Sequence, residues 1–183
     1  MSEENLVRQC APTLAGIKTG TIFPVPFDTM AGLAAEIRDL NHILVPKGLR
    51  LLPLRYQVRK ALLYLYRPAG LKRDLQDHLA EALLAEAGYP KKDSEQCVAY
   101  LARRFRSGEG FPHEVGLFLS YPPQDVSGFI ENRAVNYKCA GLWKVYGDVE
   151  QAQRLFARYR KCTDIYCELW RAGSGIGQLA VAV

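Results

Sequence analysis

Apolar residues recur at intervals of three and four positions over several long stretches of the chain, and this period predicts amphipathic helices. Asp28 and Asp93 stand just before two of these stretches, where a short polar side chain can cap a helix. Pro12 lies inside the first stretch and is expected to shorten it. The segments with a helical period are 4–15, 29–44, 68–88, 94–106 and 149–170.

Other segments alternate or concentrate apolar residues in the way that strands do. Residues 49–56 and 60–67 are apolar runs separated by three residues, which predicts a β-hairpin. Residues 20–26 predict a further short strand, and the prolines in 20–26 and at Pro53 favour edge positions, because proline cannot donate to a sheet. Residues 137–146 alternate between the two faces of a fourth strand.

About four strands and several helices follow one another without the regular β-α-β order of a parallel sheet. The pattern therefore predicts an α+β fold, with a small antiparallel or mixed sheet covered by helices. With no repeat and no linker, residues 1–183 are expected to form a single globular domain. The glycine-rich end, 173–183, is expected to be a flexible tail.

Composition narrows the class of protein. Hydrophobic residues make up 49% of the 183 residues and charged residues 23%, as in ordinary globular proteins. No apolar run reaches the roughly 18 residues that span a bilayer, so we expect no membrane partner. The acidic start of the chain, "MSEENLVRQC", lacks an export signal and predicts a cytoplasmic location. The 5 cysteines include no C-x-x-C pair, which favours reduced thiols.

The net charge of +5 is concentrated in one segment. Residues 133–161 hold seven basic and two acidic side chains, whereas the other 17 basic and 17 acidic residues balance. Such an asymmetry favours an anionic partner. No RNA-binding signature and no dense Lys/Arg tract occurs, so a small anionic ligand ranks above nucleic acid.

Four long strings carry a resemblance to a known family. They are "CAPTLAGIK" (10–18), "FPHEVGLFLSYPPQDVSGFIENR" (111–133), "NYKCAGLWKVYGD" (136–148) and "FARYRKCT" (156–163). Their order and spacing resemble the family catalogued as domain of unknown function 3793. The resemblance implies a bacterial cytoplasmic protein and hints at redox or iron physiology, but it implies no activity. The family pattern often has a second cysteine where this chain has Ala140.

His113 and Glu114 begin like the zinc-protease motif H-E-x-x-H. The motif needs its second histidine four positions later, where this chain has Leu117, so the metalloprotease interpretation fails. Two interpretations remain open. Either the pair starts a helix over 111–119, with Glu114 at its positive end, or His113 acts as a proton donor or anion contact in a pocket.

The cysteines leave a similar choice. Cys162 and Cys167 are five residues apart on a helix, about 140° around its axis, and do not point the same way. A scattered site built from Cys10, Cys139, Cys162 and His113 is open geometrically, but buried structural cysteines are favoured and no metal site is predicted. Cys10 is the candidate nucleophile if a neighbour lowers the pKa of its thiol.

The candidate ligand contacts combine basic and aromatic groups. Lys138, Lys144 and Tyr146 share the predicted strand 137–146, and Arg158 lies on the stripe of the last helix that also carries Arg154 and Lys161. A solvated face whose charges bind nothing specific is the competing interpretation. Lys18 lies in "GIKTG", between two glycines that let the chain approach a ligand closely.

Three hypotheses follow. The first is a protein that binds, or acts on, a small anionic or phosphate-bearing ligand whose identity the sequence does not give. His113, Glu114 and Cys10 are its candidate catalytic groups, and the cofactor-binding candidates are Lys18, Lys138, Lys144, Tyr146 and Arg158. The alternatives are a thiol- or metal-dependent protein of redox or iron physiology, and an RNA-interacting or scaffolding protein without catalysis.

Overall fold

The chain folds around a small antiparallel sheet with helices on both faces, which confirms the predicted α+β class. The computed structural model describes residues 2–90, 93–108 and 110–183. Strands β1 (Gly20–Pro26), β2 (Arg50–Gln57) and β3 (Lys60–Tyr66) form a three-stranded sheet in the order β1-β3-β2. The predicted hairpin is β2–β3, and β3 at the centre is buried on both faces.

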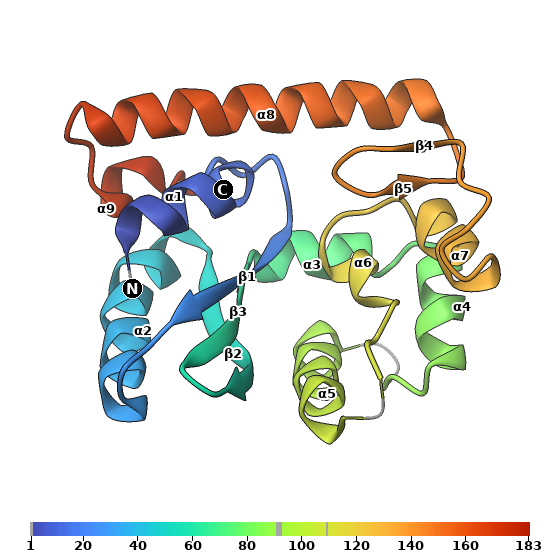
Figure 1. The fold of residues 1–183 in the computed structure, drawn as a ribbon, viewed down its shortest axis with the longest axis horizontal. Coiled ribbons are helices and arrows are strands. Elements are labelled where there is room, and N and C mark those ends of the chain that lie inside the picture. The colour runs from blue at the N-terminus through green and yellow to red at the C-terminus, as the bar shows by residue number, and fades with distance from the viewer. Residues whose placement is uncertain (1, 91–92, 109) are drawn as a thin grey trace.

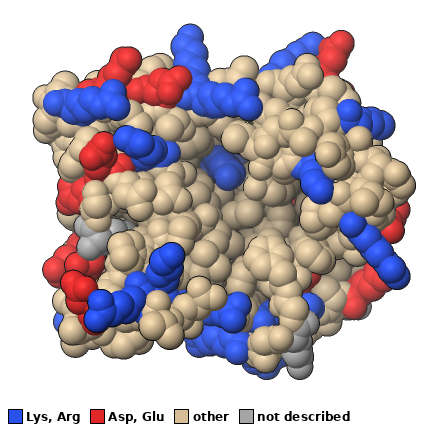
Figure 2. All heavy atoms as spheres, viewed as in Figure 1, with Lys and Arg blue, Asp and Glu red and all other residues tan. Residues whose placement is uncertain are grey.

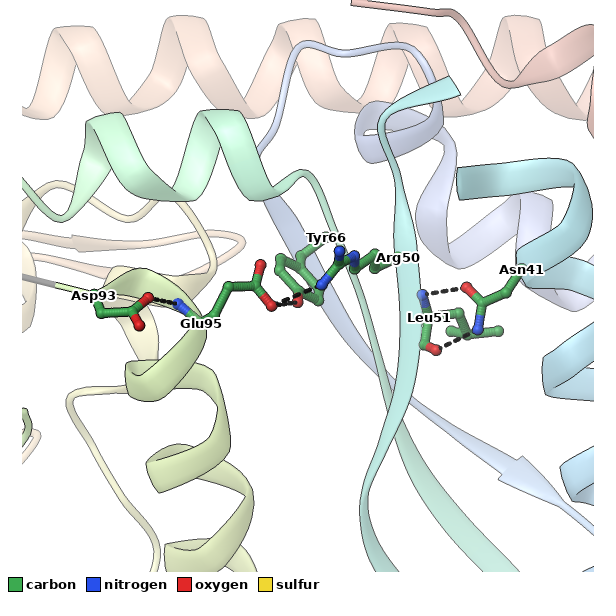
Figure 3. A network of polar contacts seen from close by, with 6 residues as sticks. All are labelled: Asn41, Arg50, Leu51, Tyr66, Asp93 and Glu95. Carbon is green, nitrogen blue, oxygen red and sulfur yellow. Dashed lines mark hydrogen bonds and ion pairs between the residues drawn. The ribbon is translucent and has the colours of Figure 1, made fainter. Parts of the chain in front are cut away.

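Both proline-bearing strands lie at edges of this sheet, as expected. The pairing of β2 with β3 shifts register between Pro53 and Arg55, because the proline has no N–H to donate. Beyond β2, Asn41 from α2 (Met30–Leu44) takes the place of a further strand (Figure 3). Its amide accepts from Leu51 N at 2.9 Å and donates to Leu51 O at 2.8 Å, so this edge is hydrogen-bonded.

One face of the sheet packs against α1 (Glu3–Leu14), α2 and the short helix α9 (Ile176–Leu179). Leu6 and Leu14 of α1 are completely buried there, together with Leu63 of β3. The cap of α2 is Thr29, whose side chain accepts from Gly32 N, and not Asp28 as expected from the sequence. A single-turn 3-10 helix, η1 (Val45–Lys47), follows α2 and ends at Gly48.

The other face packs against a group of shorter helices. They are α3 (Pro68–Asp74), α4 (His78–Glu86), α5 (Ser94–Ser107), α6 (Val115–Phe118) and α7 (Pro123–Glu131). The single helix predicted over 68–88 is wrong, because Asp77 starts a new helix by accepting from Leu79 N and Ala80 N. Glu95 of α5 bonds to Arg50 and Tyr66 of the sheet (Figure 3).

The two cores on the two faces of the sheet divide the molecule into a first half, with α1, α2 and α9, and a second half, with α3 to α7. The long helix α8 (Val149–Arg171) runs across both halves along one side (Figure 1). Near its start, Phe156 and Tyr159 are buried in a small third core around Trp143. Near its end, Tyr166 and Trp170 pack on the core of the first half. The predicted helix 149–170 is therefore confirmed, and it connects regions that are distant in sequence.

The strand predicted over 137–146 is wrong in form. The segment makes a very small hairpin, β4 (Cys139–Ala140) with β5 (Lys144–Val145). A Cβ on Gly141 would overlap the ring of Phe156, so the hairpin turn lies directly against α8. Alternating side chains fit a pleated hairpin as well as a single strand, which is why the pattern misled.

The expected flexible tail at 173–183 is instead part of the core over much of its length. Ile176, Leu179 and Ala180 are buried against α1 and α2. Val181 N donates to Leu14 O, and Arg67 donates to Val181 O at 2.8 Å. The prediction was wrong because the glycines indicate a flexible backbone, whereas the apolar residues that follow them pack against α1 and α2. Within the described residues, every helix is too short or too polar to cross a membrane.

Candidate functional site

A cavity of about 730 Å³ opens where the two halves of the molecule meet, and we call it the Lys18 cavity. Its polar and charged lining comes from the loop after α1, from the start and end of α3, and from the turn after α6. These side chains are Lys18, Thr19, Arg67, Lys72, Arg73, Asp74 and Ser120. In Figure 2 the middle of the face is hollowed, and a basic side chain lies inside the hollow.

The loop that carries Lys18 is held on both sides. After α1 ends, Ile17 N and Lys18 N both donate to Pro12 O, at 3.0 and 3.1 Å. Thr19 N donates to Ser120 Oγ at 2.7 Å, which joins the loop to the turn after α6. Gly20 follows at a point where a Cβ would lie 2.7 Å from Tyr64 Oη, so only glycine fits there.

The ammonium of Lys18 lies beside two aromatic rings and has no counter-ion among the described residues. Its Nζ is 5.7 Å from the centre of the Tyr121 ring and 5.9 Å from that of Tyr159. Within the described chain, no carboxylate forms an ion pair with this nitrogen and no group hydrogen-bonds to it. Burial lowers the pKa of Lys18 to about 8, and the Cys10 thiol nearby opposes this only in part.

Asp74, at the end of α3, faces the same cavity. Its Oδ2 accepts from Thr19 Oγ1 at 2.5 Å and from Ser120 Oγ at 3.3 Å. Burial raises the pKa of the Asp74 carboxyl, although these two hydrogen bonds and Arg73 act in the opposite direction. The pKa of Tyr159 is raised by burial and also by the charge of Asp74, so the two groups are close enough to interact electrostatically. The centre of the Tyr159 ring lies 5.9 Å from Lys18 Nζ.

The other basic groups of the cavity differ in how free they are. Arg67 is buried, and its guanidinium donates to the carbonyls of Thr13, Leu14, Lys47 and Val181. Arg67 therefore links the end of α1, the helix η1 and the segment after α9 in the cavity wall, and it adds positive charge there. Lys72 and Arg73 are exposed at the rim, where their side chains are free to move toward a ligand.

A second cavity, of about 420 Å³, is mostly apolar and includes the rings of Phe111, Tyr121, Phe129 and Trp143, and we call it the aromatic cavity. Two of the sequence candidates, His113 and Lys144, both line it. The His113 ring lies 5.1 Å from that of Phe129, and Lys144 Nζ donates to Ala134 O at 2.7 Å. The charge of Lys144 thus already has a partner within the protein.

Buried Asp125 shapes the wall of the aromatic cavity. Its carboxylate accepts from Trp143 Nε1 at 2.7 Å, from Tyr146 N at 2.8 Å and from Gly147 N at 2.7 Å. These bonds fix the β4–β5 hairpin to α7. Tyr121 lines the aromatic cavity, where its ring stacks on Trp143 at 4.7 Å, and the same ring lies 5.7 Å from Lys18 Nζ.

His113 and Glu114 do not act as a pair. Glu114 is buried and does not line the aromatic cavity. Its carboxylate accepts a hydrogen bond from Tyr89 Oη at 2.9 Å and forms an ion pair with Arg104 at 3.3 Å. His113 is exposed and contacts the rings of Phe111 and Phe129. The helix expected over 111–119 is only the short α6, because the chain before Val115 forms turns.

The cysteines are separate from one another. Cys10 is completely buried, and burial raises the pKa of its thiol far above the ordinary range, so the reactive thiolate is disfavoured there. All 5 cysteines are free thiols. In the part of the chain that the structure describes, no three His, Cys, Asp or Glu side chains come together as metal ligands.

The remaining basic candidates do not converge on one cavity. Lys138 Nζ donates to Gly147 O at 2.8 Å, and Tyr146 Oη donates to Val135 O at 2.9 Å. Arg158 is exposed on α8, beside Arg154, which pairs with Glu150 at 3.0 Å. The positive segment 133–161 is thus divided between backbone contacts and a solvated helix face. Of the predicted ligand contacts, only Lys18 lines the Lys18 cavity.

Sequence reasoning missed the partners of Lys18. Asp74 and Tyr159 lie in helical segments where a polar residue or an apolar one fits the period without special meaning. Ser120 comes from a turn with a left-handed backbone, φ 58°, which the sequence does not reveal. The one available signal was a lysine enclosed by glycines in "GIKTG".

Comparison with known proteins gives one match. No curated protein and no solved structure matches the chain. The model of the family described as "Protein of unknown function (DUF3793)" matches residues 6–180, which include every described residue of both cavities except Val183. The match covers nearly the whole chain and agrees with the family resemblance of the four sequence strings. The protein belongs to the DUF3793 family.

Proposed function

We propose that the protein binds a small anionic ligand, bearing a phosphate or a carboxylate, in the Lys18 cavity. The observation that carries the proposal is the ammonium of Lys18, which is largely withdrawn from water and yet has no counter-ion among the described residues. An unpaired buried charge is costly, and proteins that need only packing use an apolar side chain instead. A ligand anion would supply the missing partner.

The rest of the lining supports this choice. Arg67, Lys72 and Arg73 add positive charge around the cavity, against the single carboxylate of Asp74. The two tyrosine rings beside Lys18 exclude water from one side of the ammonium, which strengthens its attraction to an anion. A cavity of about 730 Å³ is large enough for a small metabolite.

The test compares two lysine variants. Thermal shift and calorimetry are run at pH 7 with inorganic phosphate, pyrophosphate, a nucleoside diphosphate and a 2-keto acid, at constant ionic strength. At least one anion should stabilise the wild-type protein. Lys18→Met should weaken that binding at least tenfold, because the central charge is lost, on the scale of about 1.4 kcal/mol or more.

Lys161→Met is the matched control, since Lys161 is exposed on α8 and lines neither cavity. It removes the same charge and should leave binding within about twofold, as expected for a screened surface charge. If no anion stabilises the wild-type protein, or if both variants weaken binding equally, the proposal is wrong.

A further inference from the structure

We infer that Lys18 forms an imine with an anionic ligand that carries an aldehyde or ketone group, with Asp74 as the proton donor. The inference rests on the proposed anion binding and adds a reaction to it. It depends on an unpaired amine and a carboxyl group that line the same open cavity, and on basic groups at its rim. All of these groups line the Lys18 cavity.

The amine of Lys18 is available as a nucleophile. It makes no hydrogen bond or ion pair with the described residues, so no bond has to break before it reacts. Its lowered pKa of about 8 leaves it uncharged more often than an ordinary lysine. At pH 7 about one Lys18 in ten is then neutral, compared with roughly one in a few thousand exposed lysines.

The carboxyl of Asp74 is suited to proton transfer. Only its Oδ2 is hydrogen-bonded, to the hydroxyls of Thr19 and Ser120, while its Oδ1 has no partner among the described residues. The raised pKa of Asp74 favours the protonated form that a general acid needs. Lys18 and Asp74 both line the Lys18 cavity, and Thr19, next to Lys18, donates a hydrogen bond to Asp74.

The chemistry is balanced without any other reactant. The nitrogen lone pair attacks the carbonyl carbon to form the C–N bond, and the carbonyl oxygen takes up a proton, which gives a carbinolamine. The proton on the carbonyl oxygen comes from the attacking nitrogen. Asp74 then protonates the hydroxyl, water leaves as the C=N bond forms, and the nitrogen returns its remaining proton to the Asp74 carboxylate. The sum is an amine and a carbonyl compound converted into an imine and water, with no oxidation or reduction.

The lining also indicates the class of substrate. While Lys18 is charged, the anionic group of a ligand pairs with its ammonium. When Lys18 is neutral and reacts, that anionic group is expected to face Lys72 and Arg73 at the rim, which leaves the carbonyl group directed to Lys18. The cavity volume of about 730 Å³ accommodates a short-chain keto acid or aldehyde acid, or a small sugar phosphate. These share one chemistry, a carbonyl group a few atoms away from an anion.

Reductive trapping tests the inference. The protein is incubated at pH 7 with glyoxylate or with dihydroxyacetone phosphate, reduced with cyanoborohydride, digested and analysed by mass spectrometry. The reduced adduct should accumulate on Lys18 at least tenfold faster than on any exposed lysine. Lys18→Met should abolish this adduct, and Lys161→Met should leave its rate unchanged. A label spread over surface lysines, without preference for Lys18, overturns the inference.

Two further variants separate the reaction from binding. Lys18→Arg keeps the charge without a nucleophile, so it should still bind inorganic phosphate while the adduct disappears. Asp74→Asn should slow trapping at least tenfold and change phosphate affinity less than threefold, with folding checked by circular dichroism. If wild-type protein binds phosphate but Lys18 is not trapped, the imine inference falls and the proposed binding function stands. If phosphate, pyrophosphate and the carbonyl probes all fail to bind, both fall.

Discussion

The two cavities each contain a lysine beside aromatic rings, but the two lysines are in different physical states. Lys144 in the aromatic cavity donates to Ala134 O and lies 4.8 Å from the Tyr137 ring centre, so the protein satisfies its charge. Among the described residues, Lys18 Nζ has two ring contacts, at 5.7 and 5.9 Å, and no hydrogen bond or ion pair. The difference teaches that a basic residue indicates a ligand when its charge is left unpaired, and a structural role when it is not.

The walls of the two cavities differ in the same way. Asp125 in the aromatic cavity accepts three hydrogen bonds from within the protein. Asp74 in the Lys18 cavity keeps one oxygen without a partner in the described part of the chain. In the aromatic cavity the polar side chains are therefore hydrogen-bonded within the protein and stabilise the fold. In the Lys18 cavity, an amine and a carboxylate oxygen are left to bind a ligand.

The strongest test of this comparison is Asp125→Ala. It leaves Trp143 Nε1 and two backbone N–H groups without their acceptor, in a site where Asp125 is 3% exposed. We expect a loss of about 3 kcal/mol in the free energy of unfolding, measured by denaturant titration. Asp164→Ala on the exposed side of α8 is the control and should change stability by less than about 0.5 kcal/mol. A loss at Asp125 no larger than the control's would refute its bracing role.

The second prediction has the opposite sign. Lys18→Met replaces an unpaired, largely buried charge by an apolar side chain of similar length, so it should stabilise the protein at pH 7. The lowered pKa corresponds to roughly 1–2 kcal/mol after allowance for partial contact with solvent. Denaturant titration beside Lys161→Met measures the gain. A Lys18→Met protein less stable than the wild type would show that the ring contacts outweigh the cost of burying the charge.

Lys144→Met should have a smaller effect and be destabilising. It removes the hydrogen bond to Ala134 O and the contacts with two aromatic rings, which together stabilise the fold by about 1 kcal/mol. The same titration measures the change. The opposite signs at Lys18 and Lys144 are the point of the comparison, and a stabilising Lys144→Met would remove the distinction between the two cavities.

The smallest expected effect is the pH dependence of the Lys18→Met gain. Well below the folded-state pKa of about 8, Lys18 is charged in both the folded and the unfolded protein, so folding bears the full free-energy cost of burying this charge. Between pH 8 and 10.5 the folded state has lost a proton that the unfolded state keeps, so wild-type stability rises relative to the variant. The difference between the two proteins should shrink by about 0.5–1 kcal/mol from pH 7 to pH 9.

Other groups around Lys18 titrate in opposite directions, which is why the prediction concerns a difference between two proteins. Burial raises the pKa values of Cys10, Tyr121 and Tyr159, and each of these lowers stability as the pH rises. Burial raises the pKa of the Asp74 carboxyl as well, which acts in the same direction as these three groups. These contributions largely cancel when wild type and variant are compared at each pH. A difference that stays constant from pH 7 to pH 9 would contradict the lowered pKa of Lys18.

Local patterns sufficed for much of the fold. The strands β1 to β3 and the helices α2, α5 and α8 were predictable because each buries one face, which sets the period of apolar residues. The break between α3 and α4 was not, because the heptad-like leucines continue through it and only the side chain of Asp77 interrupts the helix. The short β4–β5 hairpin was missed because alternation does not distinguish a strand from a tight turn.

The site divides in the same manner. The sequence indicated Lys18, through its glycine neighbours, and the choice of an anionic ligand, through net charge. It also favoured the positive segment 133–161, whose side chains the fold assigns to backbone carbonyls and to the open face of α8. Charge along a chain shows how many ions there are, but whether each one is paired depends on residues far away.

By itself, the sequence determined the α+β class, the β2–β3 hairpin and the family to which the chain belongs, because these follow from local periodicity and from long distinctive strings. Only the tertiary structure decided that Lys18, Asp74 and Ser120 line one cavity and that the Tyr159 ring lies beside Lys18, since these residues come from the loop after α1, from α3, from the turn after α6 and from α8. The physical reason is that burial and pairing are properties of neighbours in space. A lysine becomes a ligand group or a structural one according to what the fold places beside its nitrogen.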